Sequence, residues 1–162
     1  MDEPLNIVQL LKSAPEKFGG SILSVGEDDL LRVEQELGVR FPESYRQFLM
    51  YSDGGSFTDY RLYLFGIYEI ESFNPDPDWS PDLPGMIFLG NDCGDDVFYF
   101  DPENYLGKGN WAVYSVGLGV CDFEYSRYEA SSFGHLIERA LNRERLGEGS
   151  WLKNDGTLPR PD

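Results

Sequence analysis

Two helices are predicted to meet within residues 37–55, at a proline that determines where the second helix begins. Gly38 suits the left-handed conformation in which many helices end, because glycine has no Cβ to clash there. Pro42 suits the first position of the next helix, where the N–H that it lacks would be unpaired anyway. An i, i+3, i+4 spacing then defines one apolar face, made by Tyr45, Phe48 and Leu49. Because none of these residues is placed for chemistry, the segment is predicted to be a packing corner that ends at Gly54-Gly55.

The order of the other apolar patterns predicts helices first, then strands, then a closing helix. The predicted helices before the strands cover residues 5–17, 27–37 and 42–51. The predicted strands cover residues 61–65, 86–89, 97–100, 111–116 and 120–125. Residues 67–73 fit either a strand or a short helical turn, and we favour the turn. Gly19-Gly20 is predicted to interrupt regular secondary structure. Residues 74–85, with four prolines, are predicted to form a loop.

The closing helix is expected to begin at a Ser131 or Ser132 cap and to bury one apolar stripe. The pattern as a whole indicates an α+β fold, with N-terminal helices and a C-terminal helix packed on a mainly antiparallel sheet. The predicted core members are Phe41, Tyr45, Phe48, Leu49, Phe98, Phe100, Phe133, Leu136 and Ile137.

Length and composition favour one folded domain. A chain of 162 residues with 41% hydrophobic residues can build one sizeable core, but not comfortably two. We expect a single domain over residues 1–146 and a tail over residues 147–162. No apolar run approaches the roughly 20 residues of a membrane span, and the N-terminus lacks signal-peptide features. The expected location is therefore cytoplasmic.

The predicted corner carries a recognisable motif: Leu-Gly, an aromatic residue, proline, then Tyr and Phe-Leu on a helix, then Gly-Gly. The matching residues are Leu37, Gly38, Phe41, Pro42, Tyr45, Phe48, Leu49, Gly54 and Gly55. This motif resembles that of the SUKH superfamily, which unites fungal cell-wall-assembly regulators with bacterial toxin-immunity proteins. Residues 87–90, 94–95 and 98–101 are similar to the paired central strands of that family, and residues 132–137 to its closing helix. The resemblance covers most of residues 22–142 and implies a SUKH-like fold.

The formal net charge of −16 is concentrated in the middle of the chain. Residues 1–52 carry nine acids and five bases, for −4, and residues 104–162 carry eight acids and seven bases, for −1. Residues 53–103 carry twelve acids and only Arg61, for −11. A field of this sign repels nucleic acid and anionic membranes and steers basic proteins toward it.

Seven residues of this acidic third are predicted to form a surface for a protein partner: Asp76, Asp78, Trp79, Asp82, Asp92, Asp95 and Asp96. Trp79 would be the aromatic anchor and the acids its charged surround. Two alternatives remain open. The first acids alternate with prolines, as in an extended, solvated loop, and Trp79 could instead lie over the edge of the core.

The sequence predicts neither a metal site, nor a cofactor, nor an enzyme. One histidine and two separated cysteines do not make a usual zinc site, and we expect Cys93 and Cys121 to be reduced. A calcium loop counted from Asp92 fails because Gly94 offers no side-chain ligand at position three. His135 has no evident nucleophile beside it, and we interpret it as a surface or boundary residue.

The resemblance and the charge favour an intracellular immunity protein that neutralises a cognate toxin, which could be a nuclease. A nuclease needs a basic surface to hold phosphates, and an acidic protein can occupy that surface instead. The alternative is a regulatory or scaffolding module without a toxin partner, as in the fungal branch of the family. The oligomeric state is left open.

Overall fold

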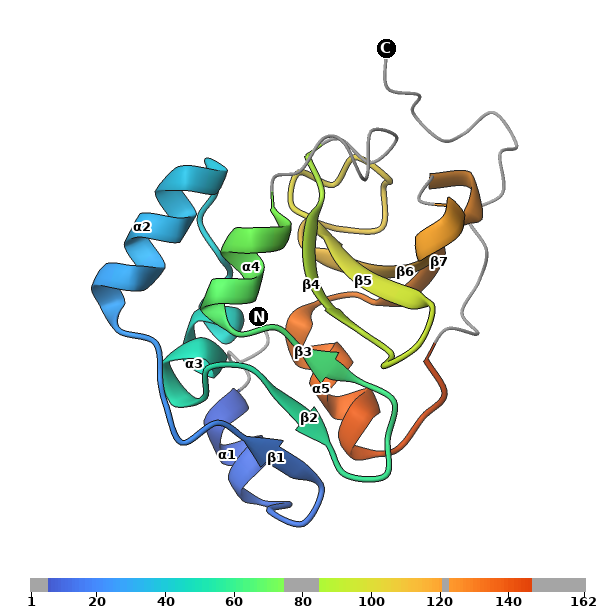
Figure 1. Cartoon of the computed structure of the whole chain (residues 1–162). Helices are drawn as coiled ribbons and strands as arrows, with labels where there is room; N and C mark the ends of the chain where they lie inside the picture. The colour runs from blue at the N-terminus through green and yellow to red at the C-terminus, as the bar shows by residue number, and fades with distance from the viewer. Residues whose placement is uncertain (1–5, 75–84, 121–122, 147–162) are drawn as a thin grey trace.

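An antiparallel sheet of seven strands organises the computed structural model, which describes residues 6–74, 85–120 and 123–146. Its strands lie side by side in chain order, so every strand pairs with the next one along the sequence (Figure 1). They are β1 (Phe18–Gly20), β2 (Gly55–Phe57), β3 (Tyr63–Leu64), β4 (Ile87–Asn91), β5 (Asp96–Asp101), β6 (Ala112–Gly117) and β7 (Arg127–Ala130). The predicted α+β class with a mainly antiparallel sheet is confirmed.

Helices surround one face of this sheet. In the described residues they are α1 (Ile7–Lys12), α2 (Glu27–Leu37), α3 (Glu43–Tyr51), α4 (Ile67–Phe73) and α5 (Phe133–Leu141). Contacts join α1, α3 and α5 to one another, whereas α4 lies between α2 and β4 (Figure 1). The predicted cap of the closing helix is confirmed, because the Ser132 hydroxyl accepts the His135 N–H at 3.1 Å.

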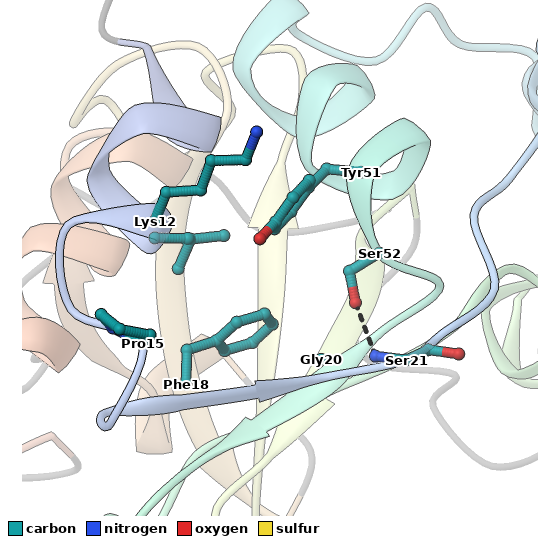
Figure 2. Close-up of a pocket in the computed structure, with 8 residues that line it drawn as sticks. Lys12, Pro15, Phe18, Gly20, Ser21, Tyr51 and Ser52 are labelled. Atoms are coloured by element: carbon teal, nitrogen blue, oxygen red, sulfur yellow. Dashed lines mark hydrogen bonds between the residues drawn. The ribbon is translucent and has the colours of Figure 1, made fainter.

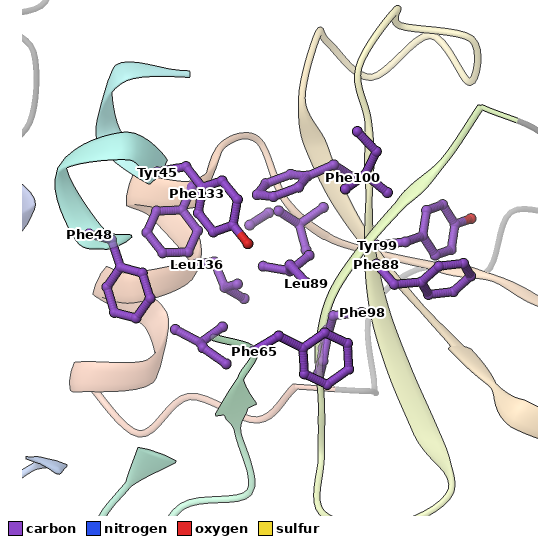
Figure 3. Close-up of a cluster of buried hydrophobic side chains, with 14 of the residues drawn as sticks. Tyr45, Phe48, Phe65, Phe88, Leu89, Phe98, Tyr99, Phe100, Phe133 and Leu136 are labelled. Carbon is purple, nitrogen blue, oxygen red and sulfur yellow. The ribbon is translucent and has the colours of Figure 1, made fainter. Parts of the chain in front are cut away.

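Aromatic rings fill the space between α3, α5 and the central strands. The Tyr45 ring lies 4.9 Å from that of Phe133 and 5.0 Å from that of Phe100, measured between centroids. Phe48 packs on the other side of Phe133, at 5.3 Å (Figure 3). All nine predicted core residues are buried, so the interior expected from the helix patterns is confirmed.

The opposite face of the central strands is buried as well. Figure 3 shows Tyr99 and Phe88 pointing away from the helices, on the far side of the strands from Phe100. Tyr99 stacks on Tyr114 with ring centroids 5.4 Å apart. Burial on both faces explains why the central strands have continuous apolar runs instead of alternating polar and apolar residues.

The corner between α2 and α3 has the expected shape, with one difference at its proline. Gly38 ends α2 with a φ of 70°, the left-handed conformation predicted for it. Pro42 was predicted to be the first residue of α3. In the structure it is the N-cap residue, and the helix begins one position later, at Glu43. The helix ends at Tyr51, and Gly55, the second glycine of the pair that follows, begins β2.

Three other predictions on secondary structure need correction. Gly19-Gly20 does not interrupt regular secondary structure but belongs to β1. The first helix starts at Ile7 and ends before Pro15, and its buried residues are Ile7 and Leu11. The strand predicted over residues 120–125 is wrong, because short 3₁₀ helices occupy Leu118–Val120 and Phe123–Tyr125. Residues 67–73 do form a helix, as we favoured.

Candidate functional site

The acidic hairpin between β4 and β5 is the part of the predicted partner surface that the structure describes. The carboxylate of Asp92 accepts the N–H of Gly94 at 2.8 Å and that of Asp96 at 3.1 Å. Such contacts to backbone groups two and four residues ahead stabilise a turn. Arg61 also donates to the Asp92 carbonyl at 3.3 Å. Asp92 therefore shapes the hairpin in addition to contributing charge.

The other two hairpin acids differ in exposure and partners. An Asp96 carboxylate oxygen in β5 lies 3.6 Å from Nη1 of Arg127 in β7, which is separated from β5 by β6. The side chain of Asp95 is exposed and has no ion-pair partner in the described part of the chain. Among the three, Asp95 is thus the acid whose charge is most available to a partner.

Burial raises the pKa of the Asp96 carboxyl above its usual value, and the nearby charge of Asp92 raises it further, while Arg127 lowers it. We expect Asp92→Asn to lower the pKa of Asp96, because asparagine keeps the oxygen that the turn needs but removes the negative charge. Arg127→Gln should raise it. Titration of the side-chain carboxyl carbon by NMR measures both shifts, and two shifts in the same direction would contradict this arrangement of charges.

The remaining predicted site residues are Asp76, Asp78, Trp79 and Asp82, which lie outside the described residues. The structure therefore does not bring them together with the hairpin, and the joint partner surface stays a prediction. Cys121 also lies outside the described residues, whereas Cys93 is an exposed free thiol in the hairpin.

A second acidic region, which sequence reasoning did not single out, lies where α2 contacts α4. We define the α2–α4 face by Arg32 and the acids around it, which are Asp28, Asp29, Glu36 and Glu71. Arg32 reaches Asp29 at 3.6 Å and Glu36 at 3.5 Å, and it also bonds Glu71 of α4. One arginine thus meets three carboxylates, and the face keeps a negative charge. Tyr68 is 78% exposed on α4, one turn before Glu71.

Part of the α2–α4 face could be recognised in the sequence, because the acids of α2 are visible there, but their position in the helix has a local explanation as well. The helix dipole favours acids in the first turn of a helix, so the acids that open α2 have a local explanation that needs no partner surface. The i+3 and i+4 spacing of Asp29, Arg32 and Glu36 places all three on one side of that helix. What the sequence could not indicate is that α4, some 35 residues later, brings Glu71 to Arg32.

A groove of about 360 Å³ opens between α1, β1 and the end of α3 (Figure 2). Its lining consists of Leu11, Lys12, Pro15, Phe18, Gly20, Ser21, Tyr51 and Ser52. The hydroxyl of Ser52 accepts the Ser21 N–H at 2.8 Å and donates to the Gly54 carbonyl at 2.6 Å. Lys12 Nζ lies 5.6 Å from the centroid of the Tyr51 ring. Because Ser21 and Ser52 are bonded to each other and to the backbone, the groove does not offer a set of reacting groups.

His135 has a local contact that the sequence analysis did not identify. Its Nδ1 accepts the backbone N–H of Ser131 at 3.1 Å and lies 3.2 Å from the hydroxyl of the same serine. Since the backbone N–H occupies the Nδ1 lone pair, that nitrogen is not free to take a proton from the hydroxyl. Within the described residues, no three His, Cys, Asp or Glu side chains gather in a way that could hold a metal ion.

Comparison with known proteins identifies a family for most of the chain. Residues 24–139, which are more than half of the sequence, match the model of the SMI1 / KNR4 family (SUKH-1). No curated protein was found to match the sequence. Among the described helices, none is long and apolar enough to cross a membrane.

Proposed function

The chain belongs to the SMI1 / KNR4 family (SUKH-1), and from this membership we propose that it is an immunity protein, which binds and neutralises a toxin. The family match carries this proposal. In this function the protein works as a binding partner and needs no catalytic group or cofactor of its own. The target is a toxin domain with a basic surface, and a nuclease is the class that fits best.

Charge supports this choice of partner. The protein has a formal net charge of −16, and a nuclease needs a positive surface to hold phosphates. An acidic protein that covers such a surface gains from electrostatic attraction and denies it to the nucleic acid. The exposed Asp95 in the hairpin and the acids of the α2–α4 face are described groups that can take part, together with the predicted loop acids. On the α2–α4 face, Tyr68 is the exposed aromatic residue suited to anchor the contact.

The test begins with a search of the neighbouring genes for a toxin domain, and then measures association kinetics against that domain at several salt concentrations. Exposed charges are screened over about 8 Å at 0.15 M salt, so the on-rate should fall about tenfold or more between low and high salt. Asp28→Asn, Asp29→Asn and Glu36→Gln together should lower the on-rate, because they remove three charges from the α2–α4 face. Neutralising the predicted loop acids Asp76, Asp78 and Asp82 should do the same, while Trp79→Ala should mainly raise the off-rate.

A charge-matched control separates the surface from the net charge. Glu16→Gln, Glu103→Gln and Glu138→Gln remove three exposed acids elsewhere on the protein and should leave the on-rate close to the parent value. Co-expression with the toxin should rescue growth for the parent and for this control. A salt-independent on-rate, unchanged by both sets of acid neutralisations, would refute the acidic surface. Failure to bind or to rescue would refute the immunity function.

A further inference from the structure

The β1 edge of the sheet is short, with three residues, but it has neither charge nor proline to protect it. β1 is the outermost strand on its side, and in the described chain no further strand lies beside it (Figure 1). Its sequence is Phe-Gly-Gly, without a charged or proline residue. The strand at the other edge, β7, carries Arg127 and Glu129. Charged residues are a common protection of edge strands against pairing with another chain, so β1 is the edge that is open to such pairing.

The backbone of β1 presents a row of free hydrogen-bonding groups. Thr58 donates to the Lys17 carbonyl at 2.9 Å, and Gly19 lies opposite Ser56 in the register. In an antiparallel pair, alternate residues direct their N–H and C=O groups to the partner strand. Lys17 and Gly19 therefore face β2, while Phe18 and Gly20 face outward. In the described structure no backbone or side-chain group bonds these outward N–H and C=O groups.

We propose that β1 pairs with β1 of a second copy of this chain, in antiparallel orientation about Gly19, so that two sheets join into one. In this register Phe18 of each copy lies opposite Gly20 of the other, and each such pair exchanges two hydrogen bonds. The two Gly19 residues face each other at the centre, where strands approach most closely and a glycine leaves the most room. The dimer is symmetric, and the same patch serves both copies.

An exposed side chain and the groove beside β1 complement each other in this dimer. Ile22 follows the strand by two residues and is fully exposed, with Leu23 64% exposed next to it. Beyond the paired strands, Ile22 of one copy lies toward the turn before β1 of the other, where Pro15 lines the groove (Figure 2). Each copy thus offers one isoleucine and receives one, in a groove whose serines, Ser21 and Ser52, are already bonded.

Local charge favours a second copy over a basic partner on this face. Residues 6–26 carry Lys12, Lys17 and Glu16, which sum to +1 in a chain of −16. A basic partner would not be attracted electrostatically to this segment, because the segment has no excess of acids. For two copies, the same lack of acids means that little like-charge repulsion arises at the contact. The dimer face is therefore distinct from the acidic faces proposed for the toxin.

Two substitutions test the pairing without disturbing the interior. A Cβ at position 19 would have the Ser56 carbonyl oxygen, 3.8 Å away, as its nearest neighbour, so Gly19→Lys should fold and place two lysines face to face. Ile22→Asp removes an exposed side chain. It should raise the dissociation constant of the dimer by about 100-fold or more, because two buried isoleucines are lost and each contributes about tenfold or more. Leu31→Asp, on α2, is the matched control and should leave the dimer unchanged.

Light scattering of the full chain over a range of protein concentrations gives the mass, and hydrogen exchange locates the contact. Parent and Leu31→Asp should reach the mass of two chains, while Gly19→Lys and Ile22→Asp should stay at the mass of one. The amides of Phe18 and Gly20 should gain protection as concentration rises, while that of Gly19, bonded to β2, should be protected throughout. Added salt should strengthen the dimer by screening the repulsion between two chains of −16, opposite to its effect on toxin binding.

A parent protein that has the mass of one chain at millimolar concentration and high salt would overturn the proposal. So would a dimer that Gly19→Lys leaves intact, because its contact would lie elsewhere. Neither result affects the proposed immunity function, which is measured by toxin binding.

Discussion

Replacing Glu34 with alanine is expected to destabilise the protein by about 3 kcal/mol, the lower end of the usual cost of removing one partner of a buried ion pair, because Arg46 is also paired with Glu27. Glu34 is 5% exposed in α2, and Arg46 of α3 is 4% exposed. One carboxylate oxygen of Glu34 lies 2.5 Å from Nη1 of Arg46, and the other accepts the backbone N–H of Phe41 at 2.7 Å. The substitution therefore leaves the Phe41 N–H without its acceptor at the corner between two helices. Among the described residues, Arg46 then keeps Glu27, whose side chain is 52% exposed, as its remaining ion-pair partner.

Chemical denaturation of Glu34→Ala and of two comparison variants checks this result. Glu36→Ala removes an exposed acid from the same helix. Both side chains of the Glu36–Arg32 pair are about half exposed, so this substitution should lower the free energy of unfolding by less than about 1 kcal/mol. Glu34→Leu with Arg46→Met removes both charges and should be more stable than Glu34→Leu alone. Equal stability of Glu34→Ala and Glu36→Ala would contradict the proposed role of the buried pair.

The shape of this corner could be predicted from the sequence, but the interaction that holds it could not. Gly38 and Pro42 act through their own backbone preferences, which are local and therefore visible in the sequence. Glu34 and Arg46 are twelve residues apart and resemble any acid and base on amphipathic helices. Only the angle between the two helices decides that these charges meet inside the protein.

Strand length explains where the prediction of the sheet failed. β1 and β2 contain three residues each, too few for an alternating pattern to appear, whereas β3 lies inside the strand predicted over residues 61–65 but is only two residues long. β1 is stabilised by pairing with β2, about 37 residues later. Because this pairing is not visible in the local sequence, Phe-Gly-Gly was interpreted as an interruption of secondary structure. The longer strands β4, β5 and β6 contain continuous apolar runs, and all three were predicted. Residues 120–125 also look β-rich, yet Phe123–Tyr125 forms a 3₁₀ turn, and Ser126, the next residue, accepts a hydrogen bond from the Tyr99 hydroxyl at 2.7 Å.

The acidic site shows the same division between local and long-range information. The hairpin turn could be predicted because its acids and glycine have strong turn preferences. The ion pair of Asp96 with Arg127 depends on strands that are far apart in sequence. The α2–α4 face likewise depends on a helix contact that joins Arg32 to Glu71.

Truncating the aromatic and aliphatic interior between α3 and α5 should produce a loss as large as that of the buried ion pair. Phe48 and Leu136 are fully buried, and the Phe48 ring lies 5.3 Å from Phe133 and 5.9 Å from Phe18, between centroids. Phe48→Ala should cost about 3–5 kcal/mol and Leu136→Ala about 2–5 kcal/mol, because each loses its transfer free energy and leaves a cavity.

A small domain is stable by only about 5–15 kcal/mol, so both variants should melt well below the parent or fail to fold. Tyr68→Ala, which removes a ring that is 78% exposed, is the control and should change stability by no more than about 0.5 kcal/mol. Thermal and denaturant unfolding measure all three variants. Parent-like melting of both Phe48→Ala and Leu136→Ala would mean that α3 and α5 do not share the interior described for them, since no well-packed core tolerates two such cavities without loss.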